Sequence, residues 1–203
     1  MNLTNEYYYF TEALDKETCD KIIKAGERVF GEATVGQQLT PLVDKKIRNN
    51  ATAWSEDQWL YDLIWPYMKE ANEQAGWKYD IEAAESIQIT RYKKGEFYNF
   101  HKDGISDNLG AYNLPEDKFK HGNVRKLSMS IILNEGYEGG GFEFATINSS
   151  ATCAEELSTT YTPDFNKLGS IIVFPSYMMH RVQPVTKGTR YSLVSWFLGP
   201  PFK

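Results

Sequence analysis

Three residues of this chain could together hold a metal ion. His101 and Asp103, in the stretch YNFHKDG, are two positions apart, and on a β-strand such residues point to the same face. His180 follows an apolar segment that ends at Pro175 and opens another extended stretch. Two imidazoles and one carboxylate form the facial triad that binds non-haem Fe(II) and leaves coordination positions open. Alone, the H-x-D pair is also typical of a solvated loop.

Arg190 could bind an anion beside that metal. It follows His180 across a turn at Gly188 and starts an apolar strand, with Ser192 on the same face. A guanidinium inside a β core costs several kcal/mol unless an anion pairs with it, and its fork suits a carboxylate. The pattern therefore predicts a site for a dicarboxylate. The alternative is an exposed Arg190 on an edge strand.

The elements that must position these residues begin with two predicted helices. The first follows Asp15, a typical N-cap residue, and the second begins with a capping-box pattern at Ser55 and Gln58 and ends near Gly76. Pro66 should kink or restart the second helix. The predicted apolar face of the first helix consists of Cys19, Ile22, Ile23, Val29 and Phe30.

From residue 85 onward the pattern changes to short strands. These segments are rich in β-branched and aromatic residues and read ESIQITRY, KLSMSIILN, GFEFATI, GSIIVFP and RYSLVSWFL. No helical period separates them, which favours a sandwich or barrel over a parallel sheet. We therefore predict an α+β fold in one domain over residues 1–203, with helices over about 1–80 buttressing a β core over about 85–200.

Two predicted loops, at residues 104–124 and 147–167, are unusually long. Loops beyond about 12 to 15 residues in a compact domain are usually functional or disordered. The first begins directly after Asp103, so it could cover the metal site. Each loop could be either a lid over the site or an ordinary surface loop.

Composition excludes several classes of partner. The net charge is −5, and no cluster of Lys and Arg interleaved with aromatics indicates nucleic-acid binding. The N-terminus lacks a basic region followed by an apolar run, and no segment approaches about 18 apolar residues, so we expect a cytoplasmic protein without a membrane partner. Cys19 and Cys153 are far apart and predict two reduced thiols. The oligomeric state cannot be read from these features.

Together the motifs resemble a known family. HKD and HRVQPVTKGTRYSLVSW look like the H-x-D, distal histidine and co-substrate arginine of 2-oxoglutarate/Fe(II) dioxygenases, specifically the prolyl 4-hydroxylase-like branch and its PKHD-type relatives. LDKETCDKII resembles the opening helix of that branch, and the main resemblance covers about residues 85–198. It implies a double-stranded β-helix, or jelly-roll, core. It also implies Fe(II), 2-oxoglutarate and O2 as cofactor and co-substrates, with ascorbate supporting the reaction.

The resemblance also implies residue roles. His101, Asp103 and His180 would be the metal ligands, and Arg190 the catalytic anchor of 2-oxoglutarate. Co-substrate contacts are implied for Tyr92, Arg190 and Ser192, and substrate contacts for Tyr98, Arg125 and Trp196. Packing or a salt bridge remains the alternative for Arg125 and Trp196. One departure is Ile132, which stands where some relatives place a second tyrosine. Arg190, Ser192 and Tyr92 would therefore have to bind the distal carboxylate without it.

The implied reaction is hydroxylation of an unactivated C–H bond, with a prolyl residue in a peptide or protein as the first expectation. Other side chains, free amino acids and small metabolites remain alternatives. Asp103 fills the position that halogenases of this superfamily leave empty, which favours hydroxylation. A non-catalytic metal-binding β-barrel module is the competitor from another class. Such a module has no need for the carboxylate clamp that Arg190, Tyr92 and Ser192 would form.

Overall fold

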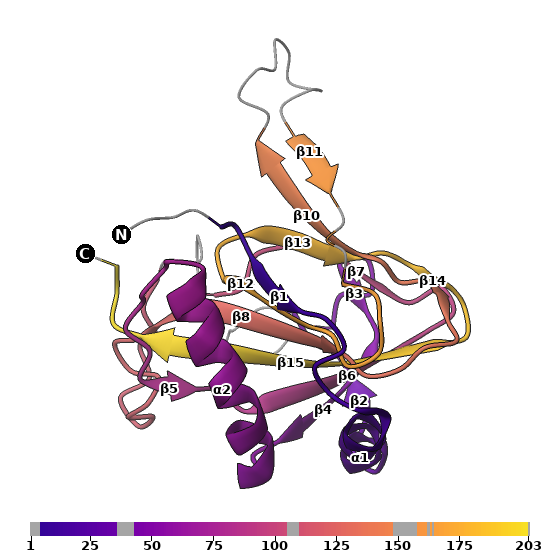
Figure 1. Cartoon of the computed structure of the whole chain (residues 1–203), viewed down its shortest axis with the longest axis horizontal. Coiled ribbons are helices and arrows are strands. Elements are labelled where there is room, and N and C mark those ends of the chain that lie inside the picture. The colour runs from indigo at the N-terminus through magenta and orange to yellow at the C-terminus, as the bar shows by residue number, and fades with distance from the viewer. Residues whose placement is uncertain are drawn as a thin grey trace.

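The computed structural model describes residues 5–35, 43–104, 110–147, 158–161, 163 and 165–202. Two β-sheets face each other, and two helices cover the outer face of the larger sheet (Figure 1). The prediction of an α+β fold with a double-stranded β-helix core is confirmed. Residues 105–109 and 148–157 of the two long loops, including Cys153, lie outside the described residues, so lids over the site stay a prediction.

The larger sheet contains the strand that carries Arg190. Its order is β1-β12-β8-β15-β6-β4-β2, with β5 also paired to β15, so β15 lies between β8 and β6. The strands are β1 (Tyr8–Phe10), β2 (Gly31–Glu32), β4 (Ala51–Ser55), β5 (Ala83–Ala84), β6 (Ile87–Lys93), β8 (Val124–Ile132), β12 (Ile171–Pro175) and β15 (Thr189–Gly199).

The smaller sheet carries both histidines of the predicted metal site. Its order is β11-β10-β13-β7-β3, and β10 and β11 form a hairpin that projects from the body (Figure 1). Its strands are β3 (Arg48–Asn49), β7 (Phe97–His101), β10 (Phe142–Ile147), β11 (Ser158–Tyr161) and β13 (Met179–Val182). A two-stranded ribbon pairs β9 (Glu138–Gly139) with β14 (Val185–Lys187).

All five strands predicted from residue 85 onward are present, but strands before residue 80 were missed. β1 pairs with β12, and β4 pairs with β6. These segments are short or lie toward the sheet edges, and their sequences do not alternate clearly between apolar and polar residues. The N-terminal part therefore extends the sheet as well as covering it.

Helix α1 (Lys16–Glu27) begins where its N-cap predicts. The Asp15 side chain accepts a hydrogen bond from the Thr18 backbone N–H at 2.8 Å. The predicted apolar face was too long, because the helix ends at Glu27. Val29 lies beyond it with 59% of its surface exposed, while Phe30 is half-buried.

Helix α2 (Gln58–Gln74) starts and continues differently from the prediction. Its N-cap is Asp57, and the Ser55 hydroxyl accepts from the Asp57 N–H at 3.2 Å instead of capping the helix. The helix continues through Pro66 without restarting. Packing explains this continuity, because a single buried stripe faces the sheet on both sides of the proline. The stripe consists of Leu60, Ile64, Met68 and Ala71.

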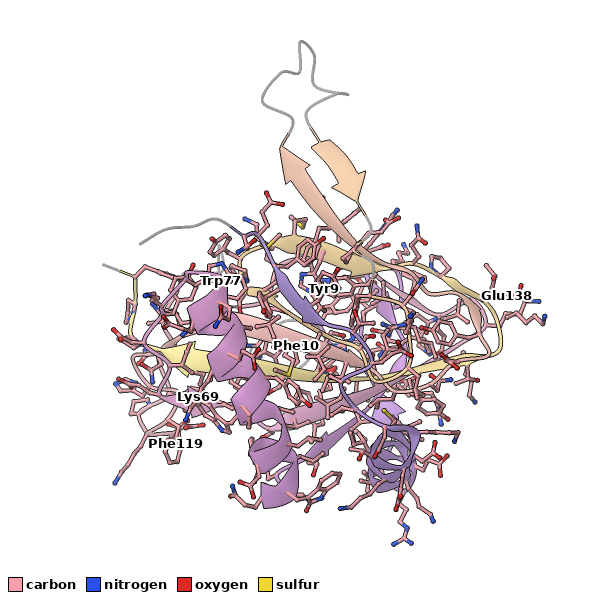
Figure 2. The ribbon with its side chains drawn as sticks, in the orientation of Figure 1. Tyr9, Phe10, Lys69, Trp77, Phe119 and Glu138 are labelled. Carbon is pink, nitrogen blue, oxygen red and sulfur yellow. The ribbon has the colours of Figure 1, made fainter. Side chains whose placement is uncertain are left out.

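Two hydrophobic clusters hold the layers together. The larger cluster lies between the helices and the larger sheet and includes Ile64, Ile89 and Phe197. The smaller cluster joins the two sheets through residues such as Phe144 and Phe174. Figure 2 shows the side chains around this framework, with Trp77 and Phe10 near α2 and Phe119 at the surface. Of the two described helices, neither has the apolar stretch of eighteen residues needed to cross a membrane.

Cys19 belongs to the larger cluster as a free, buried cysteine. Burial, and then the nearby carboxylates of Asp15 and Asp20, raise the pKa of its thiol to about 11. At neutral pH the side chain is therefore a protonated, unreactive thiol. This agrees with the predicted reduced state for Cys19.

Gly169 joins the N-terminal segment to the loop before β12. Its φ is 73°, and a Cβ built there would lie 1.9 Å from the Leu14 carbonyl oxygen. Gly169→Ala is expected to lower the free energy of unfolding by about 2 kcal/mol or more, because both the backbone conformation and the contact are unfavourable to alanine. Urea denaturation would measure the change, with Gly31→Ala as a control because its Cβ meets nothing within 4 Å. Equal stability of the two variants would contradict the expectation.

Candidate functional site

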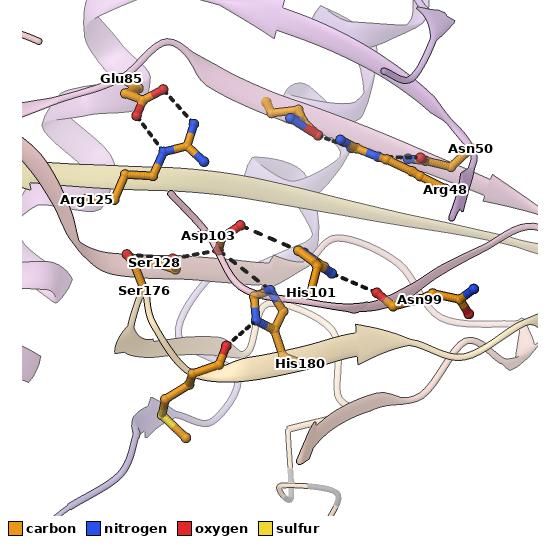
Figure 3. A network of polar contacts seen from close by, with 12 residues as sticks. Arg48, Asn50, Glu85, Asn99, His101, Asp103, Arg125, Ser128, Ser176 and His180 are labelled. Carbon is orange, nitrogen blue, oxygen red and sulfur yellow. Dashed lines mark hydrogen bonds and ion pairs between the residues drawn. The ribbon is translucent and has the colours of Figure 1, made fainter. Parts of the chain in front are cut away.

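The predicted metal ligands converge from two strands and one loop. His101 ends β7 and lies opposite His180 on the neighbouring strand β13, and Asp103 follows two residues after His101 (Figure 3). One ligand atom from each residue can be chosen so that all three lie within 4.8 Å of one another. The Asp103 carboxylate oxygens lie 3.8 Å from His101 Nε2 and 3.6 Å from His180 Nε2. These atoms can surround a single ion.

Backbone carbonyls orient both imidazoles for metal binding. Nδ1 of His101 lies 2.8 Å from the Asn99 carbonyl oxygen, and Nδ1 of His180 lies 2.9 Å from that of Met178. With Nδ1–H donating to these oxygens, each Nε2 presents its lone pair toward Asp103. Burial, and then the neighbouring His180, lower the pKa of His101 to about 3. The ring is therefore neutral near pH 7, which is the form that binds metals.

Asp103 is positioned by contacts outside its own strand. β7 ends at His101, so the alternation of side chains along a strand does not explain the position of Asp103. Its backbone N–H donates to the Ser176 carbonyl at 2.9 Å, and the Ser128 hydroxyl donates to its carboxylate at 2.7 Å. Burial alone would raise the pKa of Asp103, but His180, His101 and then other neighbours including Ser128 lower it overall. The side chain is an ionised carboxylate.

Ser128→Ala is expected to weaken metal binding by roughly 10-fold, because partners of metal-ligating carboxylates typically contribute 10- to 100-fold to affinity. The Ser176 hydroxyl lies 2.9 Å from the Ser128 hydroxyl and could partly replace it as a donor to the carboxylate in this variant. Titration of the metal-free protein with Fe(II) under anaerobic conditions would measure the affinity. Ser86→Ala is the control, since the Ser86 hydroxyl bonds Glu56 at the surface. Unchanged affinity in Ser128→Ala would show that this hydrogen bond does not position Asp103.

The structure buries Arg190 completely, with 0% of its surface exposed, on a strand flanked by two others. The alternative of an exposed arginine on an edge strand is therefore wrong. Nη1 donates to the Ser192 hydroxyl at 2.8 Å, but Nε and Nη2 have no hydrogen-bond partner among the described residues. A buried cation with two partnerless nitrogens is costly unless an anion completes it. Arg190 thus fits a carboxylate ligand.

A cavity of about 220 Å³ brings most of the predicted site residues together. The predicted residues that line it are Tyr92, Tyr98, His101, Asp103, Arg125, His180, Ser192 and Trp196. Arg190 does not itself line the cavity. Its guanidinium carbon lies 5.6 Å from the centre of the Tyr92 ring, and both Tyr92 and Ser192 contact the cavity. Ile132 lies opposite Ser192 in the sheet and is buried beside Tyr92.

The residues predicted to face the substrate line the cavity from both sheets, Tyr98 from the smaller and Arg125 and Trp196 from the larger. Tyr98 stacks on the His101 ring with centroids 3.5 Å apart. Arg125 forms a two-pronged salt bridge to Glu85, with distances of 2.6 and 2.8 Å, so the salt-bridge alternative is realised for this residue. The Arg125 guanidinium also lies 4.1 Å from the Trp196 ring centre. Arg125 therefore supports the wall of the cavity while its charge is balanced by Glu85.

The other lining residues, which sequence reasoning missed, include Arg48, Trp54 and Gln88. Gln88 left a signal, because it is a polar residue between Ile87 and Ile89 of a predicted strand. Arg48 belongs to the run KKIRNN, which looks like a solvated basic surface. Trp54 is 53% exposed, and its ring lies 6.1 Å from that of Trp196.

Comparisons with known proteins agree with this geometry. The family model described as the 2OG-Fe(II) oxygenase superfamily matches residues 87–198. A PKHD-type hydroxylase of Idiomarina loihiensis is 29% identical over 92% of this chain and 74% of its own length. A putative prolyl 4-hydroxylase of Acanthamoeba polyphaga mimivirus is 23% identical over 95% of this chain and 74% of its own length.

Solved structures share the fold. The viral collagen prolyl hydroxylase of Paramecium Bursaria Chlorella virus-1, solved with 2OG, matches with a TM-score of 0.62 and 19% identity, covering 97% of both chains. A prolyl hydroxylase of Trichoplax adhaerens, solved with a peptide fragment of hypoxia inducible factor, matches with a TM-score of 0.65 and 18% identity. That alignment covers 96% of this chain and 84% of the Trichoplax chain.

Proposed function

This chain belongs to the 2OG-Fe(II) oxygenase superfamily, and from that premise we propose that it hydroxylates a prolyl residue in a peptide or protein. The enzyme is a prolyl hydroxylase-like dioxygenase of the PKHD type that uses Fe(II), 2-oxoglutarate and O2. The observation that carries the proposal is the buried Arg190, two of whose nitrogens have no partner among the described residues. It lies beside Tyr92 and Ser192, which line the same cavity as the convergent His-Asp-His group. A metal module without catalysis would not need this arginine.

The ligand roles follow from the contacts of each side chain. His101, Asp103 and His180 would hold Fe(II), because their donor atoms converge and backbone carbonyls fix the ring orientation. Arg190 and Ser192 would hold the distal carboxylate of 2-oxoglutarate, with Tyr92 beside them. When bound, these groups with O2 supply an oxidation that converts 2-oxoglutarate to succinate and carbon dioxide and adds one oxygen atom to a C–H bond. The cavity's aromatic walls restrict water around the reacting atoms.

A prolyl residue is proposed because of both the relatives and the cavity. Three of the similar proteins carry prolyl hydroxylase names, and one of them, the Trichoplax protein, was solved with a bound peptide fragment. In this chain, Tyr98 and Trp196 line the cavity and provide aromatic surface against which a pyrrolidine ring can pack. Trp54, at 53% exposure, extends this aromatic surface outward and could contact neighbouring residues of a peptide.

The test is succinate formation by the purified protein with Fe(II), ascorbate and 2-oxoglutarate, with and without a proline-rich peptide mixture. We expect basal succinate formation, stimulation by the peptides, and addition of one oxygen atom to proline detectable by mass spectrometry. A matched mixture with alanine in place of proline is the control. Equal stimulation by both mixtures would exclude proline as the target and direct the search to other side chains, free amino acids or small metabolites.

A further inference from the structure

Arg48 is a buried cation that lines the cavity, and the proposed function does not use it. It is 8% exposed and lies on β3, where it pairs with Tyr98 of β7. The residue lines the main cavity and also a second cavity of about 250 Å³. Its side chain therefore reaches from the protein interior to the space where a substrate would bind.

Every hydrogen-bond partner of Arg48 among the described residues is uncharged. Nε donates to the Asn50 side-chain oxygen at 2.8 Å, Nη1 donates to the Thr34 carbonyl at 3.3 Å, and Nη2 donates to the side-chain oxygen of Gln88. A guanidinium carries five N–H donors, so donors remain after these contacts. These neutral partners hold the fork in place, and none of them offsets its charge (Figure 3).

The other buried charges among the described residues of the cavity are balanced. The Arg125 charge is paired with Glu85. With the proposed ligands bound, the charges of Fe(II) and Arg190 are offset by the carboxylates of Asp103 and 2-oxoglutarate. Counted over the described residues, Arg48 therefore leaves the loaded site with an excess positive charge, and the exposed Lys102 at the cavity adds to it. A buried positive charge is favourable only beside an anion, and the substrate is the molecule still to enter.

The location of Arg48 also fits contact with a substrate. The Tyr98 ring lies between Arg48 and a proposed metal ligand, with the Arg48 guanidinium 4.6 Å from the ring centre and the His101 ring stacked at 3.5 Å. A molecule lying along Tyr98 can thus place a C–H bond near the metal site and a charged group near Arg48.

We propose that the substrate carries a carboxylate, close to the hydroxylated carbon, that pairs with Arg48. This inference rests on the proposed function. Two sources share this chemistry, an acidic side chain next to the reacting residue and a free C-terminal carboxylate. A purely structural Arg48, which only ties β3 to Asn50 and Gln88, would create no preference for charge in the substrate.

The test compares blocked hexapeptides of one length, with a central proline flanked by glutamate or by glutamine. A third peptide has the glutamine sequence and a free C-terminal carboxylate. Peptide-dependent succinate formation gives kcat/KM for each. We expect the glutamate peptide to exceed the glutamine peptide by roughly 10- to 100-fold, the effect of a hydrogen bond to a charged group. Preference for the free terminus over both blocked peptides would assign the carboxylate to the chain end.

Variants then assign the preference to Arg48. Arg48→Gln is expected to reduce the ratio of glutamate to glutamine turnover toward one, while Arg28→Gln, at an exposed position, keeps it. If Arg48→Gln fails to fold, Arg48→Lys keeps the charge without the fork and should lower the ratio partially. Basal succinate formation with equal effects of all three peptides, including no effect, would overturn the inference alone. Absence of basal succinate formation in the iron-loaded protein would instead overturn the proposed function.

Discussion

His180→Ala should eliminate measurable turnover of 2-oxoglutarate, with succinate formation falling by roughly 10³-fold or more, because a catalytic metal supplies several kcal/mol of the barrier reduction. His180 is 5% exposed, and its Nε2 faces the same carboxylate as that of His101. Alanine would leave two ligands and an opening in place of the third. Iron bound after gel filtration should fall in parallel, which gives a readout independent of activity.

His121→Ala is the matched control for this variant. His121 is exposed, lies in the loop before β8, and is not part of the ligand group. Its replacement should leave both iron content and succinate formation unchanged. If His180→Ala kept its iron and its turnover, the assignment of the metal site would be wrong.

Arg190→Gln should raise the KM for 2-oxoglutarate by roughly 100-fold, since truncating one partner of a buried charge pair commonly costs 2 to 5 kcal/mol. The free protein should respond differently. Because Nε and Nη2 lack partners among the described residues, removing the charge should not lower the melting temperature of the protein without ligand. The two measurements together separate a binding role from a structural one.

Thermal unfolding with increasing 2-oxoglutarate provides the second readout for Arg190→Gln. A ligand that binds only the folded state raises the free energy of unfolding, by about 2.7 kcal/mol at a hundredfold excess over Kd. The melting temperature rises with it. We expect this rise in the unsubstituted protein and in Arg28→Gln, and its loss in Arg190→Gln. Full turnover by Arg190→Gln at low 2-oxoglutarate would require another residue to bind the distal carboxylate.

The strongly patterned parts of the sequence predicted the fold well. The long segments around Ile89, Met129 and Leu193 are apolar on at least one face and became central strands. β1 and β3 contain three and two residues, which is too short for any period to be recognised. The division into helices before residue 80 and a β core from residue 85, in one domain, stays a prediction, although strands from the first part do pair with the larger sheet.

The site could be predicted where residue type alone restricts the chemistry. Histidine, aspartate and a core arginine are costly to bury without a function, so His101, Asp103, His180 and Arg190 were recognisable. Arg48 was not recognisable, because its burial depends on the pairing of β3 with β7, which no pattern in the sequence predicts. Spacing selected Asp103 as a candidate ligand, but loop contacts rather than strand alternation explain its position.

The anchoring of the three proposed ligands has a mechanical consequence. Both histidines belong to the smaller sheet, whereas Asp103 is tied to the larger one through Ser128 of β8 and to Ser176, just after β12. An ion bound by all three is therefore a cross-link between the two sheets, added to the apolar packing that otherwise joins them. The free energy of metal binding then also resists separation of the sheets. Iron supply would set the rigidity of this enzyme as well as its activity.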